Sequence, residues 1–153
     1  MKTEETVKKT ITLRVLCILS SIASVIGVFY GLLMISIQDI PAEEARKAME
    51  ETRVMMDSNG MDTTQVTLDM VYAIARQGQW FALFNLIEIV GLTLLVRGKF
   101  AGFHLYAASQ LGVTGVFAIA IGFSSSLSYL IWNAIWVAVY YRVSKHLQED
   151  AKS

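Results

Sequence analysis

The sequence predicts an all-α integral membrane protein, a four-helix bundle with an extracytoplasmic helical hairpin between spans one and two. First, 54% of its 153 residues are hydrophobic and only 17% are charged, against about a quarter charged in a soluble domain. Second, four apolar runs approach the roughly 20 residues that cross a bilayer core as a helix. Third, basic residues gather on one side of these runs. Lipid offers no partners to the backbone, so each run is expected to be helical.

The predicted spans cover about residues 15–37, 79–96, 100–123 and 124–141, and residues 1–153 form one membrane domain. Lys8 and Lys9 precede the first run, as in a signal peptide. However, the run is longer than the about 7–15 apolar residues of a signal sequence. We therefore interpret it as a retained first span that also targets the chain to the membrane.

Charge asymmetry predicts the orientation. Nine basic residues lie before the first span, between the second and third, and after the fourth, against four in residues 38–78. The positive-inside rule therefore places both termini in the cytoplasm. The zero net charge gives no support to nucleic-acid binding.

Residues 38–78 are predicted to form an outer helical segment. Pro41 suits a first helical position, and opposite charges recur at i,i+4 spacing from Glu43 to Glu51. A second helix is expected from Thr63 or Thr64, with Val66, Met70 and Ile74 as its apolar stripe and Gly78 as a bend. Three interpretations stay open: a solvated spacer, a docking surface and an acidic mouth for cations.

Four polar residues are predicted to share one layer near the bilayer centre. Glu88 lies nine residues before Arg97, about 13 Å into the membrane at 1.5 Å per residue. Asn85, Gln110 and Asn133 reach similar depths, with Tyr106 and Tyr129 one turn from the last two. An intramembrane acid costs at least ~2.5–3.5 kcal/mol unless it is neutral or partnered. The layer is either structural, holding the helices together, or a protonatable site for ion or substrate coupling at Glu88.

Small residues predict close helix contacts, within the bundle or between subunits. The candidates are Gly27 and Gly31 in the first span, and Ala108, Gly112 and Gly115 in the third. Span four carries an aromatic stripe of Tyr129, Trp132, Trp136 and Tyr140, whose centre is predicted to face lipid, a partner helix or a hydrophobic ligand.

No residue pattern indicates catalysis, a cofactor or a metal. Cys17 is alone, so it cannot form an internal disulfide or a CxxC pair, and it is expected to be a small buried hydrophobe. His104 has no second ligand at helical spacing and is expected at the membrane interface. There is no Ser/His/Asp set and no phosphate loop.

Three segments carry a resemblance: residues 13–20 (LRVLCILS), residues 98–106 (GKFAGFHLY), and the end from Tyr140-Tyr141 to Leu147. In these the chain resembles a family of small four-span proteins from Bacteroidetes that has no assigned activity. The likeness covers most of the chain outside the outer segment. It implies topology and a bacterial inner membrane, and nothing about mechanism.

Residues 85–88 (Asn-Leu-Ile-Glu) are similar to the Asn-x-x-Glu of the membrane-bound glutathione-transferase-like superfamily, which also has four spans. The chain departs from that family where Phe81 and Leu83 replace a basic residue and where span three lacks arginines. Glutathione carboxylates need such cations.

These observations predict a non-catalytic accessory or interaction subunit of a larger inner-membrane complex, whose partners are the lipid bilayer and other membrane subunits or further copies of the chain. The alternative is a homo-oligomeric ion channel or proton-coupled small transporter using Glu88. A glutathione-transferase-like enzyme is the remote alternative.

Overall fold

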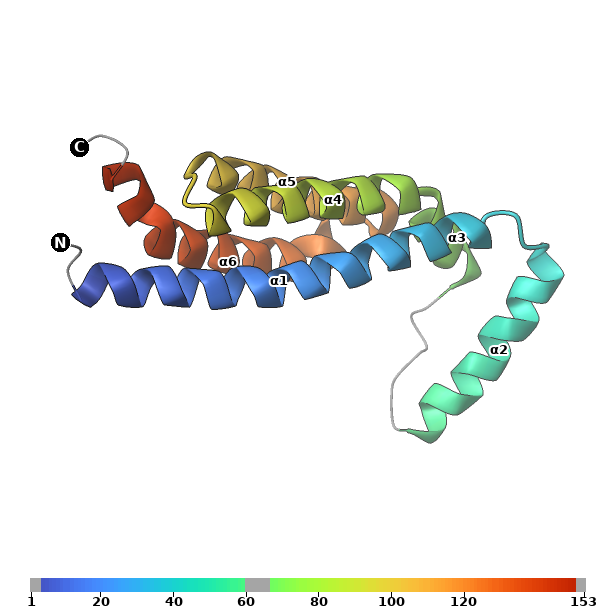
Figure 1. The fold of residues 1–153 in the computed structure, drawn as a ribbon. Helices are drawn as coiled ribbons and strands as arrows, with labels where there is room; N and C mark the ends of the chain where they lie inside the picture. The colour runs from blue at the N-terminus through green and yellow to red at the C-terminus, as the bar shows by residue number, and fades with distance from the viewer. Residues whose placement is uncertain (1–3, 60–66, 151–153) are drawn as a thin grey trace.

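The computed structural model describes residues 4–59 and 67–150, which form six helices joined by short turns (Figure 1). No strand occurs in these residues, which confirms the predicted all-α class. The helices follow one another as α1 (Glu4–Ile37), α2 (Ala42–Ser58), α3 (Leu68–Arg76), α4 (Gly78–Val96), α5 (Ala101–Ile121) and α6 (Phe123–Asp150).

Three helices are long and apolar enough to cross a membrane: Thr10–Ile37 within α1, Gly78–Val96 and Ala101–Ile121. They correspond to the first three predicted spans, with shifted ends. The first apolar stretch begins earlier than residue 15 because helix α1 continues unbroken through Thr10. The third ends earlier than residue 123, because Gly122 has a φ of 88°, a conformation that glycine adopts readily.

The predicted fourth span lies inside α6, which continues well beyond residue 141. α6 is not one of the three strongly apolar helices. Its first turns carry Ser124, Ser125, Ser126 and Ser128, and its middle carries Asn133. These polar residues lower its hydropathy, so a membrane crossing by α6 stays a prediction.

Helix α4 lies at the centre of the packing, with α1 on one side and α5 on the other, and α6 packs on α5. α1 and α6 touch less extensively. The buried core gathers near the two termini, which lie at the same end of the bundle (Figure 1). We call this the terminal end. Its core consists of Leu13, Cys17, Leu92, Leu95, Phe103, Tyr106, Tyr140 and Leu147.

At the terminal end, Tyr140 joins α6 to α1 and α5. Its hydroxyl donates a hydrogen bond to Ser20 Oγ over 2.8 Å, and its ring centroid lies 4.3 Å from that of Tyr106. Farther along, α1 follows α4, where Gly31 and Gly78 bring the two backbones together. α6 instead follows α5, to which Gly122 joins it. Helices α1 and α6 therefore touch at the terminal end and separate beyond it.

The outer segment contains two helices, and the predicted hairpin is not confirmed. α3 packs on α1 and α5, and Tyr72 donates to the Ile40 carbonyl oxygen over 2.8 Å. α2 extends away from the bundle (Figure 1), and its side chains are almost all exposed. A helix with charges on most of its surface has no broad apolar face with which to pack.

The helix boundaries in the outer segment can be compared with those expected at three places. α2 begins directly after Pro41, whose carbonyl accepts from Ala45 N. α3 begins at Leu68, with Thr67 as N-cap accepting from Met70 N over 3.2 Å. The predicted start at Thr63 or Thr64, and Val66, lie outside the described residues. The break before α4 falls at Gln77, next to the expected bend at Gly78.

Candidate functional site

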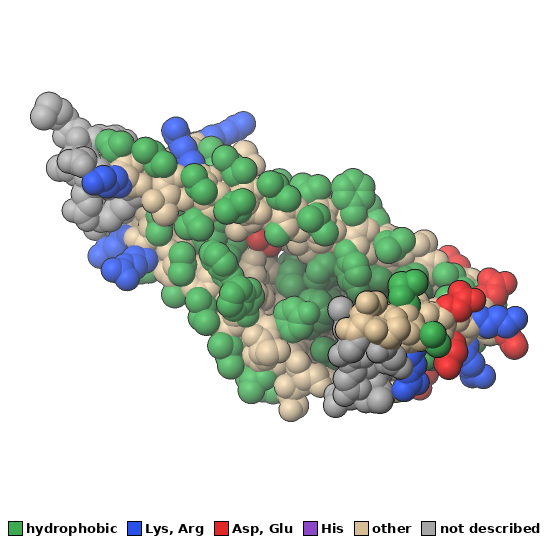
Figure 2. Space-filling view, turned by 90° about the horizontal axis from the view of Figure 1, so that it is seen from below, with side chains coloured by type: hydrophobic (Ala, Val, Ile, Leu, Met, Phe, Trp, Pro, Cys, Tyr) green, Lys and Arg blue, Asp and Glu red, His purple; other side chains and the backbone are tan. Residues whose placement is uncertain are grey.

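A groove of about 470 Å³ opens along the side of the bundle, between α1 and α6. It begins where the contact between these helices ends, and α4 and α5 form its floor. Figure 2 shows this hollowed surface, with an acidic group visible among apolar side chains. The lining residues are Leu19, Ser20, Ala23, Ser24, Asn85, Glu88, Tyr106, Gln110, Val113, Trp132, Asn133 and Trp136. We call it the Glu88 groove.

The structure brings all four predicted polar residues, Glu88, Asn85, Gln110 and Asn133, to this groove. They come from three helices, as the depth calculation predicted. Glu88 is 7% exposed and Asn85 is 6% exposed. Three helices therefore contribute polar residues to one layer. Some of these residues form hydrogen bonds with partners outside the four predicted ones.

Glu88 is held from two neighbouring helices. Its carboxyl group lies beside the polar side chains of Ser24 of α1 and Gln110 of α5. The Ser24 hydroxyl donates its one proton to the Ser20 carbonyl oxygen of its own helix, over 2.8 Å. The acid therefore has polar neighbours on two helices, as an acidic group at this depth requires, and it contributes to the wall of the groove.

Asn133 connects α6 to α5 rather than to Glu88. Its amide nitrogen donates to Thr114 Oγ1 over 2.9 Å and to the Gln110 carbonyl oxygen over 3.4 Å. Gln110 is thus the shared member, with its side chain on Glu88 and its backbone on Asn133. Such interhelical bonds are worth roughly 0.6–2 kcal/mol in a membrane.

Asn85 is bound within its own helix and packed against α1. Its amide nitrogen donates to the Phe81 carbonyl oxygen over 2.8 Å. A Cβ atom at Gly27 would collide with the Asn85 amide oxygen. Gly27 therefore makes room for a polar side chain. Gly31 instead allows close approach of two backbones, because the Gly78 oxygen would lie 2.7 Å from an added Cβ there.

The predicted helix-packing residues in span three are only partly in contact with other helices of the chain. Gly112 lies against the Phe84 ring, where an added Cβ would collide. At Gly115 an added Cβ would meet no atom within 4 Å, and Ala108 is exposed. Neither Gly115 nor Ala108 is therefore packed closely against another helix of this chain, and a contact with another subunit, the other possibility, stays a prediction.

The aromatic stripe of α6 divides between the core and the groove. Tyr140 is fully buried, whereas Trp132 and Trp136 line the Glu88 groove. Tyr129 stacks on Phe117 with ring centroids 4.4 Å apart. Tyr106, buried beside Tyr140, also lines the groove. Aromatic faces attract cations, so the groove combines a carboxyl group with rings that favour positive charge.

Sequence reasoning missed Ser24 and Thr114 as members of the polar layer. Both donate to a carbonyl one turn back in their own helix, which is what serine and threonine do in many helices. In the sequence, the spacing of Ser20 and Ser24 places two small residues on one face of the helix. That spacing indicates a helix contact and does not by itself indicate a polar layer.

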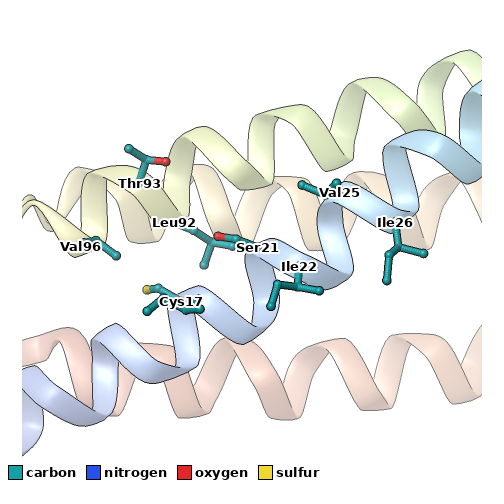
Figure 3. A pocket seen from close by; sticks show the side chains of 9 residues that line it. Cys17, Ser21, Ile22, Val25, Ile26, Leu92, Thr93 and Val96 are labelled. Carbon is teal, nitrogen blue, oxygen red and sulfur yellow. The ribbon is translucent and has the colours of Figure 1, made fainter.

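Two further hollows lie beside the polar layer. One of about 380 Å³ lies between α5 and α6, and Gln110 and Asn133 line it as well. Another, of about 450 Å³, lies between α1 and α4 (Figure 3). Its side chains are mostly isoleucine and valine, and Cys17 at its edge is fully buried, as predicted. Among the three hollows, the Glu88 groove alone contains a charged group, so it is the best candidate site.

Within the residues that the structure describes, no group of three or more His, Cys, Asp or Glu side chains is placed to hold a metal ion. His104 is exposed and makes edge contacts with the rings of Phe100 and Phe103.

Comparison with known protein families, with curated proteins and with solved structures found no match for this chain.

Proposed function

We propose that this chain binds a lipophilic cation in the Glu88 groove, with Glu88 as the counter-ion. The observation that carries the proposal is a carboxyl group set among aromatic side chains in a lateral groove between apolar helices. A carboxylate there is stabilised when a cation binds, because charges interact strongly where water is scarce. Trp132, Trp136 and Tyr106 would add cation–π attraction.

The size of the groove supports a small molecule as its occupant. Small-molecule sites usually measure about 300–1,000 Å³, and the groove measures about 470 Å³. A transmembrane helix is about 10–12 Å across with its side chains and would require a longitudinal groove along the whole span. Contact between α1 and α6 at the terminal end interrupts such a groove.

The test is a binding measurement on the purified full chain in detergent, with tetraphenylphosphonium as the probe. Trp132 and Trp136 line the groove, so binding is expected to change tryptophan fluorescence to saturation. Neutral triphenylphosphine oxide serves as the matched compound without charge. Equal responses to the two compounds would show that the groove selects for apolarity alone and would contradict the proposal.

We further propose that α6 is a fourth membrane crossing, with both termini in the cytoplasm and residues 38–78 outside, in a bacterial inner membrane. The asymmetry of nine basic residues against four supports this orientation. The packing of α6 along α5 supports a shared membrane depth.

Cysteine labelling tests this topology in a Cys17→Ser background. In intact spheroplasts, a membrane-impermeant maleimide is expected to label Ser58→Cys and Ser125→Cys at once. Lys99→Cys and Lys145→Cys are expected to react only after permeabilisation. Reaction of Ser125→Cys and Lys145→Cys from the same side would show that α6 does not cross.

A second candidate function is that of a non-catalytic interaction subunit that binds a neighbouring membrane protein through α2. Its support is the position of α2, which extends from the bundle and leaves Val54 at 65% and Met55 at 66% exposure. Val54 and Met55 are adjacent in sequence, and an exposed apolar patch rimmed by polar residues is typical of a contact surface, although it is too narrow to pack α2 against its own bundle.

Purification in mild detergent followed by mass spectrometry tests this candidate. We expect a foreign subunit in constant ratio, lost when Val54→Ser and Met55→Ser are combined. Glu43→Gln combined with Glu44→Gln, at the other end of α2, is the control and should retain it. Recovery of the chain alone, or as a homo-oligomer, would contradict the subunit role and favour an oligomeric channel or transporter.

A further inference from the structure

A cavity of about 320 Å³ lies at the terminal end of the bundle, apart from the Glu88 groove. The beginning of α1, the turn between α4 and α5, and the end of α6 enclose it. Its lining residues are Thr10, Leu13, Arg14, Leu95, Val96, Arg97, Gly98 and Leu147. The two arginines come from different helical segments and meet at one cavity.

The cavity has an apolar floor and a basic rim. Leu13, Leu95 and Leu147 are buried, whereas Arg14 and Arg97 are exposed. Among the residues that the structure describes, no acidic residue lines it. Two cations beside one cavity repel each other, so an anion placed between them relieves an unfavourable interaction.

The position of the cavity along the helices is that of lipid headgroups. The apolar stretch of α1 begins at Thr10 and that of α4 ends at Val96, and both residues line the cavity. It therefore lies where the hydrocarbon core of a bilayer gives way to polar headgroups. On the face drawn in Figure 2, the charged side chains visible near this end are lysines and arginines, whereas acidic and basic side chains lie together near the other end.

From this arrangement we propose that the cavity binds the phosphate group of an anionic phospholipid, with Arg14 and Arg97 as its ligands. Guanidinium groups bind phosphate oxygens through paired, charge-assisted hydrogen bonds. The leucine floor contacts the beginning of the acyl chains, which distinguishes a lipid from free phosphate. Basic sites between helices at the cytoplasmic surface are suited to anionic headgroups. This proposal does not depend on the function of the Glu88 groove.

Native mass spectrometry of the full chain, titrated with phosphatidylglycerol in mild detergent, tests the proposal. Wild type is expected to bind one lipid in preference to phosphatidylcholine. Arg14→Gln combined with Arg97→Gln should weaken phosphatidylglycerol binding at least about tenfold, because two charge-assisted contacts are lost. The matched control is Arg142→Gln, an exposed arginine of α6 that does not line the cavity, and it should bind as wild type does.

Competition with inorganic phosphate separates the two sources of the phosphate group. Phosphate at millimolar concentration should leave the lipid bound, and displacement would identify a free-phosphate site and overturn the lipid assignment. Unchanged lipid binding by the double variant would overturn it too, as would an equal loss in Arg142→Gln. All variants change exposed side chains, so the thermal unfolding of each should match that of wild type. If the double variant unfolds at a lower temperature, Arg14→Lys combined with Arg97→Lys replaces it. These lysines keep the charge and lose the paired geometry, so weaker binding is again expected, and full binding would contradict the arginine pair.

Discussion

Replacing Glu88 by glutamine is expected to weaken the binding of tetraphenylphosphonium strongly while the bundle stays folded. The substitution removes the only charge that lines the Glu88 groove. Removing one partner of a buried charge pair costs about 2–5 kcal/mol of binding free energy, which weakens binding by at least about thirtyfold. Glutamine has the same shape and can still form hydrogen bonds with Ser24 and Gln110, so unfolding should change little.

The measurement is tryptophan fluorescence during titration, with thermal unfolding of the same sample. Asp69→Asn is the matched control, because Asp69 is an exposed acid of α3 outside the groove. Acid pH should also weaken wild-type binding, since a protonated carboxyl group carries no charge. Tyr106, the other titratable side chain of the groove, is neutral over that range. Binding by Glu88→Gln equal to that of wild type would remove Glu88 from the site.

The largest expected effect on stability comes from Gly102→Ala. An added Cβ would collide with the Gly91 carbonyl oxygen and lie 2.7 Å from Leu95 N. Both atoms belong to the backbone of α4, so α4 and α5 must separate where they pack most closely. Such overpacking costs about 1–3 kcal/mol, and here no flexible side chain can yield.

Gly115→Ala is the control for this experiment, because it makes the same chemical change in the same helix. There an added Cβ would meet no atom within 4 Å. The two substitutions bring a similar gain in helix propensity, at most ~1 kcal/mol, so their difference measures the contact. Unfolding in a mixed-micelle denaturant titration should show Gly102→Ala less stable than wild type and Gly115→Ala at least as stable. Equal stabilities would mean that α4 and α5 are not close at Gly102.

The depth of the polar layer was predictable from the sequence, whereas the directions of its side chains were only partly so. A fixed rise per residue places Glu88 and Gln110 at one level, and both line the same groove in the structure. Whether Ala108 or Gly115 faces a neighbour depends on the rotation of α5 about its axis. Neighbouring helices set that rotation. Small residues lie on several sides of α5, so their positions in the sequence did not predict which side faces a neighbour.

The outer segment shows a similar division. Charge pairs and Pro41 predicted a helix where α2 is found, because these signals act within one turn. Its position relative to the bundle was not predictable, since opposite charges at i,i+4 spacing stabilise a helix without specifying a neighbour. In the fourth predicted span the helix itself was predictable and is found as α6. Its serines lower its hydropathy, so the sequence does not decide whether this helix crosses the membrane.

The lateral position of the Glu88 groove has a consequence for how any occupant reaches it. The groove opens between α1 and α6 rather than at an end of the bundle. With α6 crossing the membrane as proposed, the proposed ligand arrives from the hydrocarbon phase and not from water. Partitioning concentrates lipophilic compounds in that phase before they meet the protein. A modest intrinsic affinity is then sufficient for high occupancy, and the apparent affinity measured against aqueous concentration depends on the quantity of lipid or detergent present.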